Sequence, residues 1–133
     1  MNAPAGLITG KSALPAEETV ARLEREIREK GLTVFAKVDH SGGARAAGLS
    51  LRFTQLLLFG NPKGGTPLMQ SRQTIGIDLP LRLLVWQDER GDVFVSCDSP
   101  AWLAARHGIA DRSEAIALLS KTLEALIAIV AGR

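Results

Sequence analysis

The sequence predicts an α+β fold, a two-layer sandwich in which helices pack on one face of a mostly antiparallel sheet. Three observations lead to this prediction. The run from Leu51 to Phe59 ends in four consecutive apolar residues, as expected of a strand covered on both faces. Leu81 to Asp88 and Asp92 to Cys97 are strand-like and are separated by a short turn, which predicts a hairpin. The segment from Arg112 to about Ala131 carries apolar residues at helical spacing.

The first forty residues predict a strand, a helix and a second strand. Leu7 to Ala13 is short and mixed in character, and fits a first strand. Pro15 suits the first position of a helix whose exposed face carries acid–base pairs four residues apart, and Gly31 fits a left-handed cap at its end. Thr33 to His40 then alternates as a strand, with His40 at the end of an apolar row.

Capping residues mark the remaining helices. A serine, threonine or aspartate that precedes a proline, or that stands three residues before a glutamate, is typical of a helix start, and glycine is typical of a helix end. These signals predict a short helical turn capped by Ser41 and closed by Gly48, a helix from about Pro67 to Gln73 capped by Thr66, a helix from Ala101 to His107 after Ser99 and Pro100, and a last helix capped by Asp111 with Glu114.

Length and composition predict a single domain that spans residues 1–133. A chain of this size holds one core, and its 46% of hydrophobic residues is ordinary for a globular protein. The net charge of +2 comes from intermixed acidic and basic residues, so we expect no nucleic-acid partner. Cys97 is the only cysteine, which favours a reducing compartment. We expect a cytoplasmic protein with no signal peptide and no membrane contact.

Three motifs resemble one known family. They are LLFGNPKGGTPLM at 57–69, DLPL at 78–81 and SPAWLAARHG at 99–108. Together they resemble the bacterial family called domain of unknown function 302, in a collinear match from about Lys11 to the C-terminus. The resemblance implies a two-layer fold of the TATA-binding-protein-like type, with the order β-α-β4-α, and it implies a homodimer. It implies no established activity.

The FGNPKGGTP turn is the first candidate site. Lys63, the flexible amides of Gly64 and Gly65, and a helix N-terminus capped by Thr66 are groups that bind phosphate or carboxylate. The phosphate-binding loop of nucleotide hydrolases places lysine after its second glycine, whereas here the lysine comes first, so nucleotide hydrolysis is disfavoured. The alternative is purely structural: glycine and proline shape a tight strand exit, and Asn61 hydrogen-bonds its own turn.

His40 is the second candidate, because an imidazole at a strand end can act as an acid, a base or a metal ligand near neutral pH. Asp39 does not obviously orient the ring, since adjacent strand residues point to opposite faces. A structural histidine near the sheet edge is the alternative. The two histidines, Cys97 and Asp98 match no usual metal-ligand spacing, so we expect no metal site. His107 fits a helix C-terminus, and Cys97 fits a buried, inert thiol.

These features predict a binding or sensing module rather than an enzyme, with catalytic residues and any cofactor left unassigned. We expect a homodimer that binds a small ligand, anionic or partly apolar, in a groove formed by His40, Asn61, Lys63, Gly64, Gly65 and Thr66. The alternative is an oligomerisation or protein-docking domain without a ligand. A third hypothesis is an enzyme that uses His40 as a base and Lys63 to hold an anionic substrate.

Overall fold

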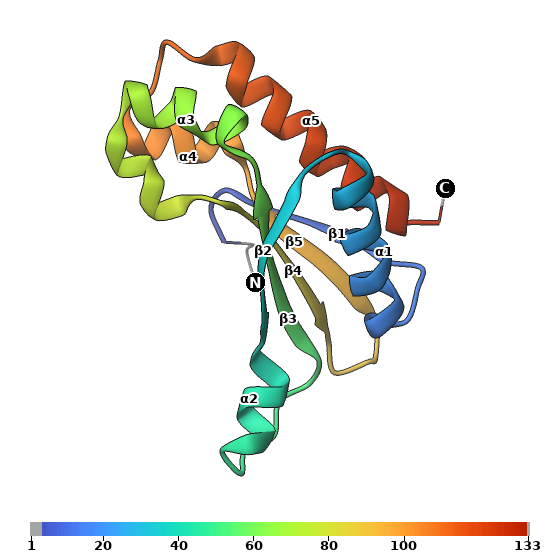
Figure 1. Ribbon diagram of the computed structural model, residues 1–133. Coiled ribbons are helices and arrows are strands. Elements are labelled where there is room, and N and C mark those ends of the chain that lie inside the picture. Colours follow the sequence, from blue (N-terminus) through green and yellow to red (C-terminus); the bar gives the residue numbers. More distant parts are fainter. Residues whose placement is uncertain (1–3, 133) are drawn as a thin grey trace.

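A computed structural model describes residues 4–132 and has the α+β architecture that the sequence predicts (Figure 1). The elements, in chain order, are β1 (Leu7–Lys11), α1 (Ala16–Glu29), β2 (Thr33–Asp39), α2 (His40–Ala46), β3 (Thr54–Gly60), α3 (Pro62–Ser71), the 3-10 helix η1 (Gln73–Asp78), β4 (Leu81–Gln87), β5 (Val93–Asp98), α4 (Pro100–His107) and α5 (Ser113–Val130).

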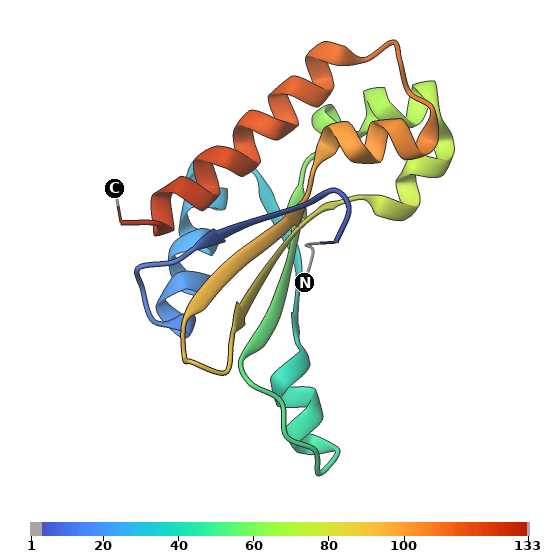
Figure 2. The same ribbon diagram turned by 180° about the vertical axis from the view of Figure 1, so that it is seen from behind.

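The strands form one antiparallel sheet in the order β1-β5-β4-β3-β2. Helices α1 and α5 pack on one face, which we call the covered face (Figures 1 and 2). The alternation of each strand turns its most apolar row toward these helices, so that Leu57, Phe59, Leu83 and Val95 are fully buried. The predicted fold class is confirmed.

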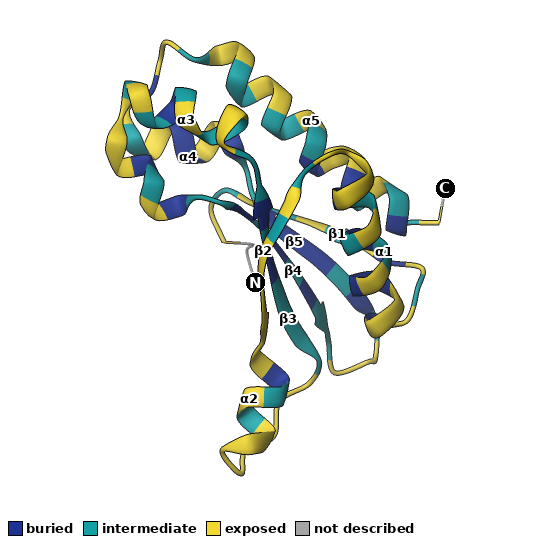
Figure 3. Ribbon diagram, in the orientation of Figure 1, coloured by how far each residue is buried: buried dark blue, intermediate teal, exposed yellow. Residues whose placement is uncertain are grey.

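The other face of the sheet, which we call the open face, has no helix over it in the described part of the chain. Its central side chains are those of Leu56, Leu84, Trp86 and Phe94, which alternate with the buried row and are half-buried (Figure 3). The rings of Trp86 and Phe94 stack with their centroids 4.9 Å apart. The sheet therefore presents an apolar surface on this side.

A second, smaller core lies beyond one end of the sheet. Helices α3 and α4 and the 3-10 helix η1 gather there, and α5 extends over them from the main layer (Figure 1). Its largest buried side chains are those of Leu68, Ile75, Leu103 and Ile109. The η1 segment was not predicted from the sequence.

At the opposite end of β2 and β3, residues 40–53 form a projection that we call the arm (Figures 1 and 2). β2 ends at Asp39, whose carboxylate accepts a hydrogen bond from the Gly42 amide at 2.9 Å and so caps α2. The prediction that Ser41 is the cap and that His40 ends the strand is wrong, because Asp39 stops the strand one residue earlier. His40 is the first residue of α2.

Two other helix starts differ from the prediction. Asn61 rather than Thr66 caps α3, because its side chain accepts from the Gly64 amide at 3.0 Å and Pro62 fits the first helical position. The predicted capping box of α5 is absent: Asp111 instead bonds the Ser71 hydroxyl and Arg112. The caps of α4, Ser99 at its start and left-handed Gly108 at its end, are confirmed.

Candidate functional site

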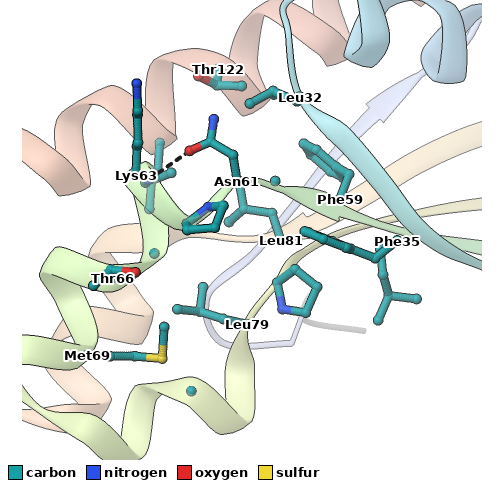
Figure 4. Close-up of a pocket in the computed structure, with 18 of the residues that line it drawn as sticks. Leu32, Phe35, Phe59, Asn61, Lys63, Thr66, Met69, Leu79, Leu81 and Thr122 are labelled. Atoms are coloured by element: carbon teal, nitrogen blue, oxygen red, sulfur yellow. Dashed lines mark hydrogen bonds between the residues drawn. The ribbon is translucent and has the colours of Figure 1, made fainter.

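A cavity of about 570 Å³ lies where β2 and β3 meet α3 and α5 (Figure 4). This volume is in the range of small-molecule binding sites. Its walls come from five parts of the chain: Leu32 and Phe35; Leu58 to Thr66; Met69; Gly76 and Leu79 to Leu81; and Leu118, Leu119 and Thr122. The cavity is therefore a product of the tertiary fold rather than of one motif.

The lining is mostly aliphatic and aromatic, with a few polar groups. Asn61, Thr66 and Thr122 contribute the polar side chains, and Lys63 is the only charged residue of the lining. No carboxylate lines the cavity among the described residues. Lys63 is exposed, and its ammonium group points away from Phe35 and Leu79 in Figure 4, so that an anion at the rim would meet this cation while the rest of a ligand meets apolar surface.

Glycines of the FGNPKGGTP turn allow the cavity wall to pack closely. A Cβ at Gly65 would lie 3.3 Å from Leu79 Cδ1, and one at Gly64 would lie 3.4 Å from Leu119 Cδ2. Larger side chains at these positions would displace those leucines or fill the space between them. The motif thus shapes the strand exit and also forms part of the cavity wall. From the sequence alone, the structural role and the binding role are alternatives.

A β-bulge brings Phe35 to the cavity. Val34 stands opposite Phe59, and Ala36 stands opposite Leu58, which leaves Phe35 as the extra residue. Its ring lines the cavity while 55% of the residue remains exposed. The simple alternation predicted for this strand is wrong here, because the bulge shifts Val34 and Ala36 to opposite faces.

The structure brings five of the six predicted site residues to this cavity. Asn61, Lys63, Gly64, Gly65 and Thr66 all line it, as Figure 4 shows for three of them. The sixth does not reach the cavity.

His40 lies at the other end of the sheet. β2 and β3 pair from Thr33 opposite Gly60 to Asp39 opposite Gln55, and six residues of strand span roughly 20 Å. An acid–base group and an anion holder must contact the same substrate. The hypothesis of an enzyme that combines His40 with Lys63 therefore does not fit this geometry.

Comparison with known proteins places the chain in a family. The family model described as "Domain of unknown function DUF302" matches residues 8–127. This chain belongs to the DUF302 family. A crystal structure of an uncharacterized conserved DUF302 protein from Bacillus stearothermophilus is similar in fold, with a TM-score of 0.85 and 21% sequence identity, over 96% of this chain and 99% of that one. The predicted family resemblance is confirmed.

Longer proteins contain a segment similar to this DUF302 chain. A protein from Brucella suis biovar 1 named "Fluoride-specific ion channel FluC 1" is 47% identical over 104 residues, which are 78% of this chain and 41% of that protein. The protein of the same name from Brucella abortus biovar 1 is equally similar, over 38% of its length. The chain thus spans about two fifths of these relatives. No helix among residues 4–132 is long and apolar enough to cross a membrane.

A polar cluster behind the cavity wall of this DUF302 chain joins η1 to α4. The Asp78 carboxylate, 8% exposed, accepts from Arg106 Nη1 at 2.9 Å and lies 2.6 Å from His107 Nε2. In a neutral ring His107 Nδ1 then accepts from the Thr74 hydroxyl at 3.0 Å. His107 ends α4 as predicted, but its partner is 29 residues away and was not predicted. The cluster holds η1, which carries Gly76 and is followed directly by Leu79.

The remaining sequence candidates lie apart from the cavity. Cys97 is buried on the covered face, and burial, followed by the charge of Asp98, raises the pKa of its thiol to about 11. A thiol of this kind is protonated and a poor nucleophile at neutral pH. Within residues 4–132, no three histidine, cysteine or carboxylate side chains stand close enough to hold a metal ion.

Most of the cavity lining could not have been found from the sequence. Phe35, Met69, Leu79, Leu119 and Thr122 belong to ordinary strand and helix patterns. Only their convergence in space makes them a site. A bulge that exposes an aromatic side chain is a useful signal, but it is visible only once strand pairing is known.

Proposed function

We propose that this domain is a small-ligand binding or sensing module, and that its ligand has an apolar body with an anionic group. The cavity is the observation that carries the proposal: its volume suits a small molecule, its walls are mostly apolar and Lys63 supplies the only lining charge. Binding fits better than catalysis, because no carboxylate, histidine or cysteine lines the cavity among the described residues.

A thermal-shift titration with paired probes tests this function. Decanoate has an apolar chain and a carboxylate, and decan-1-ol has the same chain without charge. A ligand that binds only the folded state raises the unfolding temperature with its concentration. We expect decanoate to stabilise the domain more than decanol, and Lys63→Ala to remove most of that difference.

Two matched pairs of variants control the experiment. Thr122→Trp fills the cavity from α5 and should abolish the effect of both probes, whereas Lys121→Trp, one residue along on an exposed position, should not. His40→Ala should behave as wild type, because His40 is at the far end of β2. Stabilisation by decanoate that survives Thr122→Trp unchanged would show that the cavity is not the site.

A homodimer formed through the open face is a second proposal, and it is compatible with the first. The apolar row of Leu56, Leu84, Trp86 and Phe94 is half-buried, and Val38 on the edge strand is 39% exposed. A second copy would remove this contiguous surface from water.

Sedimentation velocity at low micromolar concentration tests the homodimer. The wild type should be a dimer, and Leu56→Lys with Leu84→Lys should give a monomer. A monomeric wild-type protein in sedimentation velocity would contradict the homodimer. A dimer that shows no ligand binding in the thermal-shift titration would favour a ligand-free docking domain.

The Brucella relatives suggest a setting beside a membrane. An ion channel must span the bilayer, and no described helix of this chain can. We propose that channel function in those proteins belongs to the unmatched part of their chains, and that this domain works next to membrane proteins of that class, in the cytoplasm. Fluoride itself does not suit the cavity, because a small hydrated anion would exchange its water for mostly apolar walls.

A further inference from the structure

The tip of the arm presents two leucines to solvent. Leu49 is 67% exposed and Leu51 is 51% exposed, and only Ser50 separates them. They lie on a segment that extends away from the sheet (Figures 1 and 2). The base of the arm is well anchored: the Ser41 hydroxyl accepts from the Thr54 amide at 3.2 Å, and the Phe53 carbonyl accepts from the Gln87 amide at 3.0 Å. The leucines are therefore held outward on a supported projection.

Around these leucines, the charged residues that belong to the arm itself are all basic. Arg45 and Arg52 flank them, and no aspartate or glutamate occurs from His40 to Ile77. The nearest carboxylate in sequence, Asp39, bonds the Gly42 amide and the Ser41 hydroxyl at the base of the arm, and these bonds, with the charge of Arg45, hold its pKa below the usual value. The tip thus combines exposed apolar side chains with two exposed arginines, of which Arg45 also interacts with the charge of Asp39 at the base of the arm.

We propose that the tip of the arm docks on an anionic lipid surface. Leu49 and Leu51 would enter the boundary between headgroups and acyl chains, while the guanidinium groups of Arg45 and Arg52 pair with lipid phosphates. This inference rests in part on the proposed membrane setting, and it is independent of the cavity. The expectation of no membrane contact came from the lack of a spanning segment, which does not address a peripheral contact.

Two other partners fit the tip less well. The tip of a second copy carries the same two arginines, so two tips repel. A nucleic acid would satisfy the arginines, but no aromatic residue stands on the tip for bases to stack on, and the leucines would remain in water. A lipid surface satisfies both the charge and the apolar side chains.

The expected binding is weak and reversible, because two leucines and two arginines amount to a modest anchor comparable with a single acyl chain. A homodimer that presents two arms to the same surface would bind more tightly through avidity. Such an anchor holds a domain near a membrane without inserting it.

Vesicle co-sedimentation of the whole chain tests the proposal. The vesicles are phosphatidylcholine alone, or phosphatidylcholine with phosphatidylglycerol. We expect binding to the anionic vesicles only, weakened at high salt. Arg45→Glu with Arg52→Glu should reduce the partition coefficient at least about tenfold, and Leu49→Ser with Leu51→Ser should also reduce it severalfold.

Matched variants keep the result specific to the arm. Lys30→Glu with Lys121→Glu makes the same change of net charge, at the C-cap of α1 and on α5. Ile77→Ser removes an apolar side chain that is 76% exposed on η1. Both should bind nearly as wild type, and decanoate titration should be the same in all of them. The proposal is overturned if wild type does not bind anionic vesicles, if the arm variants bind as well as the controls, or if the leucine changes alter sedimentation of the free protein rather than vesicle binding.

Discussion

The two faces of the sheet are made from the same strands but have different surroundings. On the covered face Leu57 and Phe59 are fully enclosed by the layer of α1 and α5. On the open face Leu56 and Leu58, which alternate with them along β3, remain partly accessible. These four positions of β3 are all leucine or phenylalanine, so the hydrophobicity of this strand alone does not tell which row forms the core. The helices decide this, and they leave a second apolar face for a partner.

The largest expected effect separates the two rows of β3 directly. Leu57→Ala should destabilise the domain by roughly 2–5 kcal/mol, because it leaves a cavity in a close-packed core. Leu56→Ala should cost about 1 kcal/mol in the monomer, because solvent fills part of the vacated space. Urea unfolding at two protein concentrations measures both. If a second copy covers the open face, the loss of unfolding free energy caused by Leu56→Ala will grow with protein concentration. Equal losses for Leu56→Ala and Leu57→Ala in a dilute monomer would contradict the difference between the two faces.

An intermediate effect concerns Cys97, on the covered face of β5. Its pKa of about 11 in the folded state exceeds the ordinary value near 9, so stability from the neutral thiol is complete below pH 9 and is lost as the pH rises toward 11. This difference in pKa corresponds to up to about 3 kcal/mol. The difference between wild type and Cys97→Ala in unfolding free energy, followed from pH 8 to 11, isolates this contribution. A disulfide exchange reagent that labels the folded protein rapidly at pH 8 would show that the thiol is not enclosed.

The smallest expected effect tests the polar part of the open face. The Ser96 hydroxyl accepts from Trp86 Nε1 at 2.8 Å and lies 2.7 Å from the Thr9 hydroxyl. Ser96→Ala should cost about 1 kcal/mol, since solvent can replace part of these bonds. A double-mutant cycle with Trp86→Phe measures the coupling between the two side chains. If Ser96→Ala costs well above about 1 kcal/mol in a concentrated dimer but not in a dilute monomer, a second copy excludes water from Ser96 and Trp86.

The sequence anticipated much of the fold because the fold depends on local patterns. The hairpin of β4 and β5 and the stripe of α5 follow from residue periodicity, and the caps at Ser99 and Gly108 follow from residue type. The candidate site was only partly predictable. The FGNPKGGTP turn was found through its lysine and glycines, whereas its grouping with His40 does not fit the structure, because β2 and β3 are antiparallel neighbours and their C-terminal ends lie at opposite ends of the sheet.

By itself, then, the sequence determined the secondary structure, the family and the turn that forms one wall of the cavity, since all three depend on residues close together along the chain. Only the tertiary structure decided that α1 and α5 leave one apolar face open, that a bulge brings Phe35 to the cavity, and that His40 belongs to an arm far from Lys63. These features depend on strand order, register and helix packing. They arise from contacts between segments distant in the chain, for which local propensity carries no information.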